Sequence, residues 1–313
     1  MSSTPTYFTN TKIRTHQHSD QVYWNAFSQQ TVEIASNILN NPLYQKNFKF
    51  LLLFLGEKRH VAAQILGHEK HNHRTHKYGQ PRFGMRCLEL VTNPGVWQEL
   101  YPAIQTRLEK DRNSPYFSKD SSNGSYVYSN NDFIITINKD EYMFSYPLVA
   151  DRKAFSKNCQ ALQPDFDALL TWNGDDLDEF VKGLGRLSYS LYRQLPFFLG
   201  TSAIVHWLTR AVARYKGVEL GPLQDNENDL PLDWEAFLTY EREKYANWFL
   251  KHAFQWHKLN RINPERNHSN QALSVASLLT QVNSHQSSHP IYSKSREYDS
   301  PVQENSLTQT LQH

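Results

Sequence analysis

The spacing of apolar residues divides the chain into helical stretches joined by polar loops. In most stretches leucine, valine, isoleucine and aromatic residues recur every three or four positions, which places them on one face of an α-helix. The pattern predicts helices at 28–39, 44–56, 61–68, 95–111, 165–170, 176–194, 202–216 and 233–258. Gly56 is expected to end the second of these helices, and Pro196 the helix at 176–194.

One run of the chain has a different pattern. Residues 126–146, "YVYSNNDFIITINKDEYMFSY", alternate β-forming residues on both sides of "NKDE". Alternation of this kind, interrupted by a short polar turn, is typical of a β-hairpin. The fold class predicted from the two patterns together is mainly α (α+β), with one small sheet.

Both ends of the sequence are poor in large apolar residues. Residues 1–20 and 263–313 are rich in Ser, Asn, Gln, His and Thr, so they bury too little apolar surface to offset the entropy lost on ordering. We therefore expect a disordered N-terminal tail at 1–20, a single domain at 21–262 and a disordered polar C-terminal tail at 263–313.

Charge and hydropathy exclude several classes of protein. Lys and Arg outnumber Asp and Glu by only 33 to 31, so we expect no nucleic-acid partner. The apolar run at 48–55 is much shorter than the roughly 20 residues of a membrane-spanning helix. No Sec signal or myristoylation site is visible at the start of the sequence. We expect a soluble protein without a membrane anchor. Cys87 and Cys159 are expected to be ordinary buried thiols.

The segment 176–249 concentrates the candidate chemistry. Gly200, Thr201 and Ser202 open a predicted helix, whose first backbone N–H groups and positive dipole end can bind an anionic phosphate. A second interpretation is that Thr201 or Ser202 simply caps the helix and Gly200 makes a tight turn. Along the same helix, His206 and Arg210 are spaced by four residues, as is Arg214, and so share one face.

The same segment resembles the Fic/AvrB (Fido) superfamily. "LPFFLGTSA" keeps Pro196, Phe197 and Gly200 of the Fic motif H-P-F-x-x-G-N-G-R. It is more similar to the AvrB family of plant-pathogen effectors, on the pieces "LPFFLGTSA", "TRAVA", "KGVELGPL" and "LDWEAF". The likeness covers about seventy residues. It departs from the pattern at Leu195 in place of the Fic His, at Ala203 in place of an Arg, and at Leu199 in place of the AvrB-type Arg.

The resemblance implies a Fido/AvrB-like helical bundle whose small β-hairpin acts as a flap. It implies a secreted bacterial effector, active in the host cell cytoplasm, that transfers a glycosyl (deoxyhexose) or nucleotidyl group to a host protein hydroxyl. The donor would be a nucleotide or nucleotide-sugar, with no other cofactor and no metal. The expected phosphate-binding residues are Gly200, Thr201, Ser202 and Arg210. Asp233, which matches the family's acidic site residue, or His206 would be the catalytic base.

Two other functions stay open at this stage. The departures at Leu195, Leu199 and Ala203 suit a catalytically inactive Fido-fold effector that binds host proteins. The second is a metal hydrolase, suggested by a cluster of histidines at His60, His68, His71, His73 and His76. The spacing of His68 and His71 is one residue short of the H-E-x-x-H zinc motif. The basic residues of this cluster, Arg59 among them, could instead supply phosphate contacts that Leu199 lacks.

Overall fold

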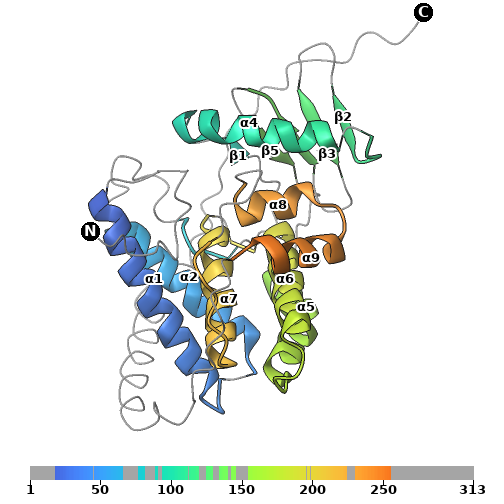
Figure 1. The fold of residues 1–313 in the computed structure, drawn as a ribbon. Coiled ribbons are helices and arrows are strands. Elements are labelled where there is room, and N and C mark those ends of the chain that lie inside the picture. The colour runs from blue at the N-terminus through green and yellow to red at the C-terminus, as the bar shows by residue number, and fades with distance from the viewer. Residues whose placement is uncertain are drawn as a thin grey trace, which may run out of the picture. The chain divides into compact units, whose positions relative to one another are not determined.

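Helices dominate the part of the chain that the computed structural model describes, and a small antiparallel sheet accompanies them (Figure 1). The described residues are 18–44, 46–65, 77–81, 89–90, 94–111, 113–119, 125–129, 134–139, 142–145, 154–194, 196–197, 199–223 and 230–254. All of them belong to one compact unit, Met1–Gln271. The predicted class, mainly α with a small sheet, is confirmed.

Two neighbouring helices, α6 and α7, hold the core together. The described helices are α1 (His18–Leu39), α2 (Phe48–Ile65), α4 (Pro94–Lys110), α5 (Ala154–Thr171), α6 (Leu177–Gln194), α7 (Thr201–Tyr215), α8 (Leu232–Leu238) and α9 (Arg242–His252). Helix α6 packs against α5, α7, α8 and α9, whereas α7 packs against α1 and α2. The side chain of Trp207 on α7 is fully buried and meets Trp24 of α1, with ring centroids 5.3 Å apart.

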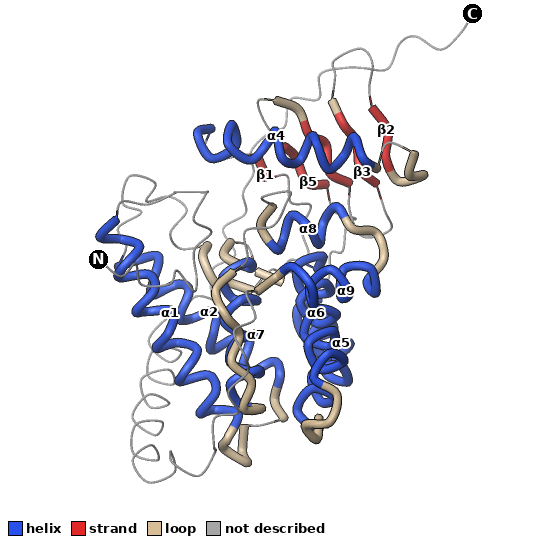
Figure 2. The backbone as a smooth tube through the Cα atoms, in the orientation of Figure 1, coloured by secondary structure: helices blue, strands red, loops and turns tan. Residues whose placement is uncertain are grey.

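The predicted hairpin is part of a five-stranded antiparallel sheet. Its strands are β1 (Glu89–Leu90), β2 (Phe117–Lys119), β3 (Tyr126–Ser129), β4 (Ile134–Ile137) and β5 (Tyr142–Ser145), in the order β1-β5-β4-β3-β2 (Figure 2). Ile137 pairs with Tyr142, so β4 and β5 form the hairpin around "NKDE", which confirms that prediction. The side chains of Ile135 and Ile137 are buried and that of Ile134 is exposed, as alternation requires.

Helix α4 lies beside the sheet and is tied to it by polar contacts (Figure 2). Tyr126 of β3 donates its hydroxyl to Glu109 of α4 at 2.7 Å. Trp97 of α4 donates its indole N–H to the backbone carbonyl of Asn138, at the turn after β4, at 3.2 Å. Trp97 also meets Trp234 of α8, with ring centroids 5.8 Å apart. Helix α8 is therefore in contact with α4 on one side and with α6 on the other.

The expected stop at Gly56 is wrong, because α2 continues through it to Ile65. Gly56 allows close packing against α2 and does not end the helix. A Cβ atom at this position would lie 2.6 Å from the carbonyl oxygen of Gly79 and 2.8 Å from the ring of Phe197. Only glycine lets the segments 77–81 and 196–197 approach α2 this closely.

The single helix expected at 233–258 is wrong as well. The chain leaves helical geometry after Leu238: Thr239 and Glu241 are extended, and α9 begins at Arg242. The carbonyl oxygen of Thr239 accepts hydrogen bonds from Tyr189 and Arg193 of α6, at 3.1 and 3.2 Å. Side chains of α6 thus replace the backbone donors that a continuous helix would have supplied, which the sequence pattern of 233–258 does not reveal.

Two helices begin earlier than expected. Helix α1 starts at His18, within the segment 1–20 that was predicted as a tail, while residues 1–17 and the predicted C-terminal tail at 263–313 lie outside the described residues. Helix α5 starts at Ala154 and contains Pro164. Its buried Phe155, Cys159 and Leu162 extend the apolar face, and their burial offsets the backbone hydrogen bond that proline removes.

Replacing Gly56 and Gly183 with alanine is expected to change stability in opposite directions. Both glycines lie inside helices. A Cβ at Gly56 meets backbone and a buried ring, so overpacking should lower the free energy of unfolding by about 1–3 kcal/mol. A Cβ at Gly183 meets only the movable end of Leu169, at 3.0 Å, so the helix-propensity gain of about 0.5–1 kcal/mol should prevail. Urea denaturation checks both variants. Equal effects would contradict the packing role of Gly56.

Candidate functional site

Helices α6 and α7 are joined by a short loop that turns at Gly200. Gly200 is the N-cap residue of α7, and its backbone is left-handed, with φ of 86° and ψ of 11°. Glycine has no side chain that could cap the first N–H groups of the helix. The interpretation that Thr201 or Ser202 is the N-cap is therefore wrong, because α7 already includes both residues. The start of α7 keeps the positive dipole end that favours an anion.

The two hydroxyls at the start of α7 have different surroundings. Thr201 is buried, and its hydroxyl donates to the carbonyl oxygen of Phe197 at 3.4 Å. Ser202 is exposed, and its side chain hydrogen-bonds both Asp233 and Tyr192. Ser202 is thus the hydroxyl that solvent and a ligand can reach, whereas Thr201 anchors the loop.

Asp233 meets the start of α7 although the two are far apart in the sequence. It lies in the first turn of α8, where its carboxylate accepts the backbone N–H of Trp234 at 2.9 Å and the hydroxyl of Ser202. The side chain of Ser202 also hydrogen-bonds the phenol of Tyr192. The structure therefore brings two of the predicted site residues, Ser202 and Asp233, into direct contact.

The carboxyl of Asp233 has the character of a base. Burial raises its pKa above the ordinary value, and the hydrogen bonds from Trp234 and Ser202 oppose that shift without cancelling it. Asp233 nevertheless keeps part of its surface accessible, so it is not sealed from solvent. A raised pKa makes the carboxylate a stronger proton acceptor. Burial also raises the pKa of Tyr192 well above its usual range, so this phenol stays neutral.

His206 and Arg210 share a helix face, as predicted, but that face points into the protein. Arg210 donates its Nε to Nε2 of His206 at 2.8 Å, and its two terminal nitrogens to the carbonyl oxygens of Leu220 and Gly221 at 2.6 and 2.8 Å. Burial and the charge of Arg210 hold the pKa of His206 well below its usual range. Arg210 thus fastens the segment after α7.

Two residues beside the start of α7 were not singled out from the sequence: Tyr192 was given no role, and Arg59 was named only among several basic residues that could supply phosphate contacts. Tyr192 is one of the buried residues of α6. Arg59 was grouped with the nearby histidines, yet its side chain lies against Gly200. A signal for Arg59 was available, because it continues the buried stripe of Leu52 and Leu55 along α2. A charged residue in such a stripe indicates a special role.

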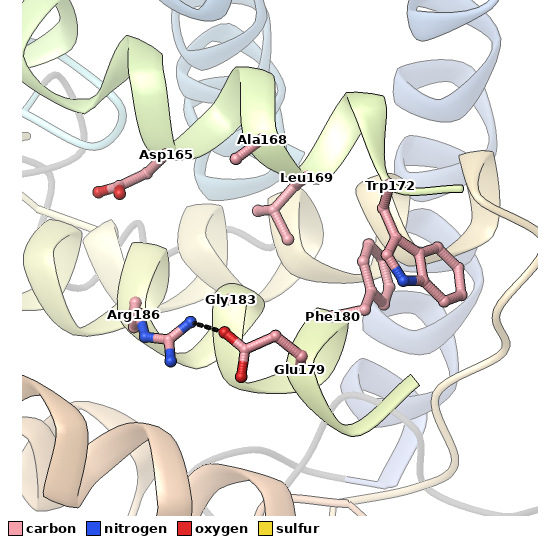
Figure 3. Close-up of a pocket in the computed structure, with 8 residues that line it drawn as sticks. All are labelled: Asp165, Ala168, Leu169, Trp172, Glu179, Phe180, Gly183 and Arg186. Carbon is pink, nitrogen blue, oxygen red and sulfur yellow. Dashed lines mark hydrogen bonds and ion pairs between the residues drawn. The ribbon is translucent and has the colours of Figure 1, made fainter. Parts of the chain in front are cut away.

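A separate groove between α5 and α6 offers less chemistry (Figure 3). It encloses about 160 Å³ and is lined by Asp165, Ala168, Leu169, Trp172, Glu179, Phe180, Gly183 and Arg186. Its charged groups already have partners: Arg186 pairs with Glu179 at 2.5 Å and Asp165 with Arg242 at 2.5 Å. Trp172 stacks on Phe180, with centroids 4.4 Å apart. We therefore place the candidate site at the start of α7.

The histidine cluster falls largely outside the described residues, as do Leu195, Cys87 and the segment 66–76. Within the described ranges, His60 lies on α2 beside Gln64, at 3.0 Å, and no three His, Cys, Asp or Glu side chains are placed to hold a metal ion. Cys159 is buried, which raises the pKa of its thiol to about 11. No helix among these residues is both long and apolar enough to cross a membrane.

Comparison with known proteins leaves the chain without an assigned family. No protein-family model and no curated protein matches its sequence. The chemistry of the α7 start and of Asp233 is accordingly the basis for the function proposed next.

Proposed function

We propose that this protein is a transferase with a Fido/AvrB-like fold that moves a glycosyl (deoxyhexose) or nucleotidyl group from a nucleotide donor to a hydroxyl of a host protein. In this proposal it is a secreted bacterial effector that acts in the host cell cytoplasm. The observation that carries the proposal is the contact between Ser202, at the start of α7, and Asp233, at the start of α8. It puts an anion-favouring helix end and a carboxylate base side by side.

The reaction assigned to this site needs one base and one anion site. Asp233 takes the proton of the acceptor hydroxyl while the oxygen of that hydroxyl attacks the donor. With a nucleotide-sugar, the oxygen bonds to the anomeric carbon and the nucleoside diphosphate leaves. With a nucleoside triphosphate, it bonds to the α-phosphorus and pyrophosphate leaves. Either leaving group is an anion, which the first N–H groups of α7 stabilise.

Asp233 is a better candidate for the base than His206. The Nε2 of His206 accepts a hydrogen bond from Arg210 in the interior, so it has no proton-accepting position directed at an acceptor. Asp233 has a half-buried carboxylate with a raised pKa, next to an exposed hydroxyl. The mainly helical fold and its β4–β5 hairpin agree with the expected bundle and flap, and thereby support the proposal.

A melting-temperature screen with nucleotides and with TDP- and UDP-sugars tests the proposal. We expect at least one compound, at about 100 times its Kd, to stabilise the protein by roughly 2.7 kcal/mol. Ser202→Ala should weaken that shift, because it removes the hydroxyl between the helix start and Asp233. Thr171→Ala is the matched control, since Thr171 is exposed and its helical hydroxyl bonds the carbonyl oxygens of Asp167 and Ala168 within α5. If no compound shifts the melting temperature, the transferase proposal loses its basis.

A further inference from the structure

Arg59 is a buried cation of α2 without an anionic partner among the described residues. The residue is 9% exposed. Its Nε and Nη1 atoms are buried and have no hydrogen-bond acceptor in the described part of the chain. Buried arginines are almost always paired with carboxylates or saturated by carbonyl oxygens, as Arg210 is in this protein. Arg59 therefore stands out as a donor group whose acceptor is still to be found.

The groups that do contact Arg59 are aromatic. Its guanidinium lies over the ring of Tyr78, 4.2 Å from the centroid, and over that of Trp24 at 5.2 Å. These ring faces attract a cation but accept none of its in-plane N–H groups. Burial lowers the pKa of Arg59 to about 10, so the side chain is still charged at neutral pH. The two rings thus hold the guanidinium plane and leave its edge for an acceptor.

The aliphatic stem and Nε of Arg59 lie against Gly200, at the start of α7. A Cβ atom on Gly200 would lie 2.7 Å from Cγ of Arg59 and 3.0 Å from its Nε. Gly200 lacks this atom and has the left-handed backbone that turns the chain into α7. Segment 77–81, which carries Tyr78, is fixed to the same loop by the hydrogen bond from the backbone N–H of Gly79 to the carbonyl oxygen of Leu199, at 3.0 Å.

Two positive features therefore converge on one point. The first N–H groups of α7 carry a partial positive charge, and they lie beside a full positive charge on Arg59. The two repel each other unless an anion lies between them. A phosphate fits both, because its oxygens accept backbone N–H groups and the fork of a guanidinium at the same time.

We propose that Arg59 and the first turn of α7 together form a phosphate-binding site. Its ligand is a phosphate or diphosphate group, and Arg59 supplies the charge at a loop where Leu199 cannot. The assignment of that group to a nucleotide donor rests on the proposed function, whereas the anion site itself does not.

Calorimetric titration with inorganic pyrophosphate and with ADP tests this site. We expect the wild-type protein to bind both, and Arg59→Met to weaken binding by roughly tenfold or more, because a charge-assisted bidentate contact is lost. Arg59→Lys, which keeps the charge but not the fork, should retain part of the affinity. Arg214→Gln is the matched control, since Arg214 lies at the far end of α7, half-exposed and paired with Glu33 at 3.7 Å.

Melting temperatures without ligand separate this site from a purely structural role. If Arg59 is an anion ligand, Arg59→Met removes an unpaired buried charge, and the melting temperature should stay the same or rise. If Arg59→Met lowers the melting temperature and leaves pyrophosphate binding unchanged, Arg59 serves only to pack between Trp24 and Tyr78. That result would overturn the proposal. So would wild-type protein that binds neither anion. Pyrophosphate binding without transfer from any donor would leave this site standing and remove the transferase function alone.

Discussion

Asp233→Asn is expected to abolish group transfer while the donor still binds. Asparagine has the same shape and can still accept the N–H of Trp234, which keeps the first turn of α8 in place. It cannot take the proton of an acceptor hydroxyl. Removal of a general base typically costs about 10²–10⁴-fold in rate. The measurement is the rate of label incorporation into host protein from the donor found in the screen, beside the Kd of that donor.

The stability of this variant provides the control. Because burial raises the pKa of Asp233, the ionised carboxylate costs the folded state free energy at neutral pH, and its removal should not lower the melting temperature. The wild-type rate should rise with pH through that pKa and then level off. An Asp233→Asn variant that folds and transfers as fast as the wild type would rule out Asp233 as the base. Donor binding without transfer in the wild type would favour the inactive, host-protein-binding alternative.

Arg210→Met should unfold the protein far more readily than a typical helix substitution. Methionine keeps the bulk but leaves the carbonyl oxygens of Leu220 and Gly221, and Nε2 of His206, without their Arg210 donors. Each buried acceptor that loses its partner costs about 1–3 kcal/mol. Two or three of them should together lower the free energy of unfolding by roughly 3 kcal/mol or more. Urea denaturation measures the change.

Arg214→Gln, one turn further along α7, serves as the comparison. Arg214 is half-exposed, and its pairing with Glu33 spans 3.7 Å, so its loss should change stability by less than about 0.5 kcal/mol. Pyrophosphate titration adds a second reading, because Arg210→Met should bind that anion as the folded wild type does. If Arg210→Met loses anion binding but keeps its stability, Arg210 belongs to the phosphate site, as predicted from the sequence.

Local sequence patterns predicted most elements of the fold, and long-range contacts explain the errors. Apolar spacing located α4, α6 and α7 closely, because each helix buries one continuous stripe. Gly56 looked like a helix end because its partner, Gly79, is distant in the sequence. The break after Leu238 depends on Tyr189 and Arg193 of another helix. Neither contact leaves a mark in the local pattern.

The candidate site was predictable in the same partial sense. The turn at Gly200 and the first-turn position of Asp233 follow from local rules for helix ends. Their meeting through Ser202 does not, since it depends on how α7 and α8 pack around Tyr192. The spacing of His206 and Arg210 gave the correct shared face without saying whether it points inward. Arg59 was predicted only as one of several basic residues in the histidine cluster, because nothing local shows that its neighbours in space are Gly200, Trp24 and Tyr78.

A structure of the protein in complex with the nucleotide that gives the largest melting-temperature shift tests the central claim most directly. We expect phosphate oxygens between the first turn of α7 and the guanidinium of Arg59, with the group to be transferred facing Asp233. A nucleotide bound elsewhere, for example in the groove between α5 and α6, with no ligand contact to Ser202, Arg59 or Asp233, would contradict it.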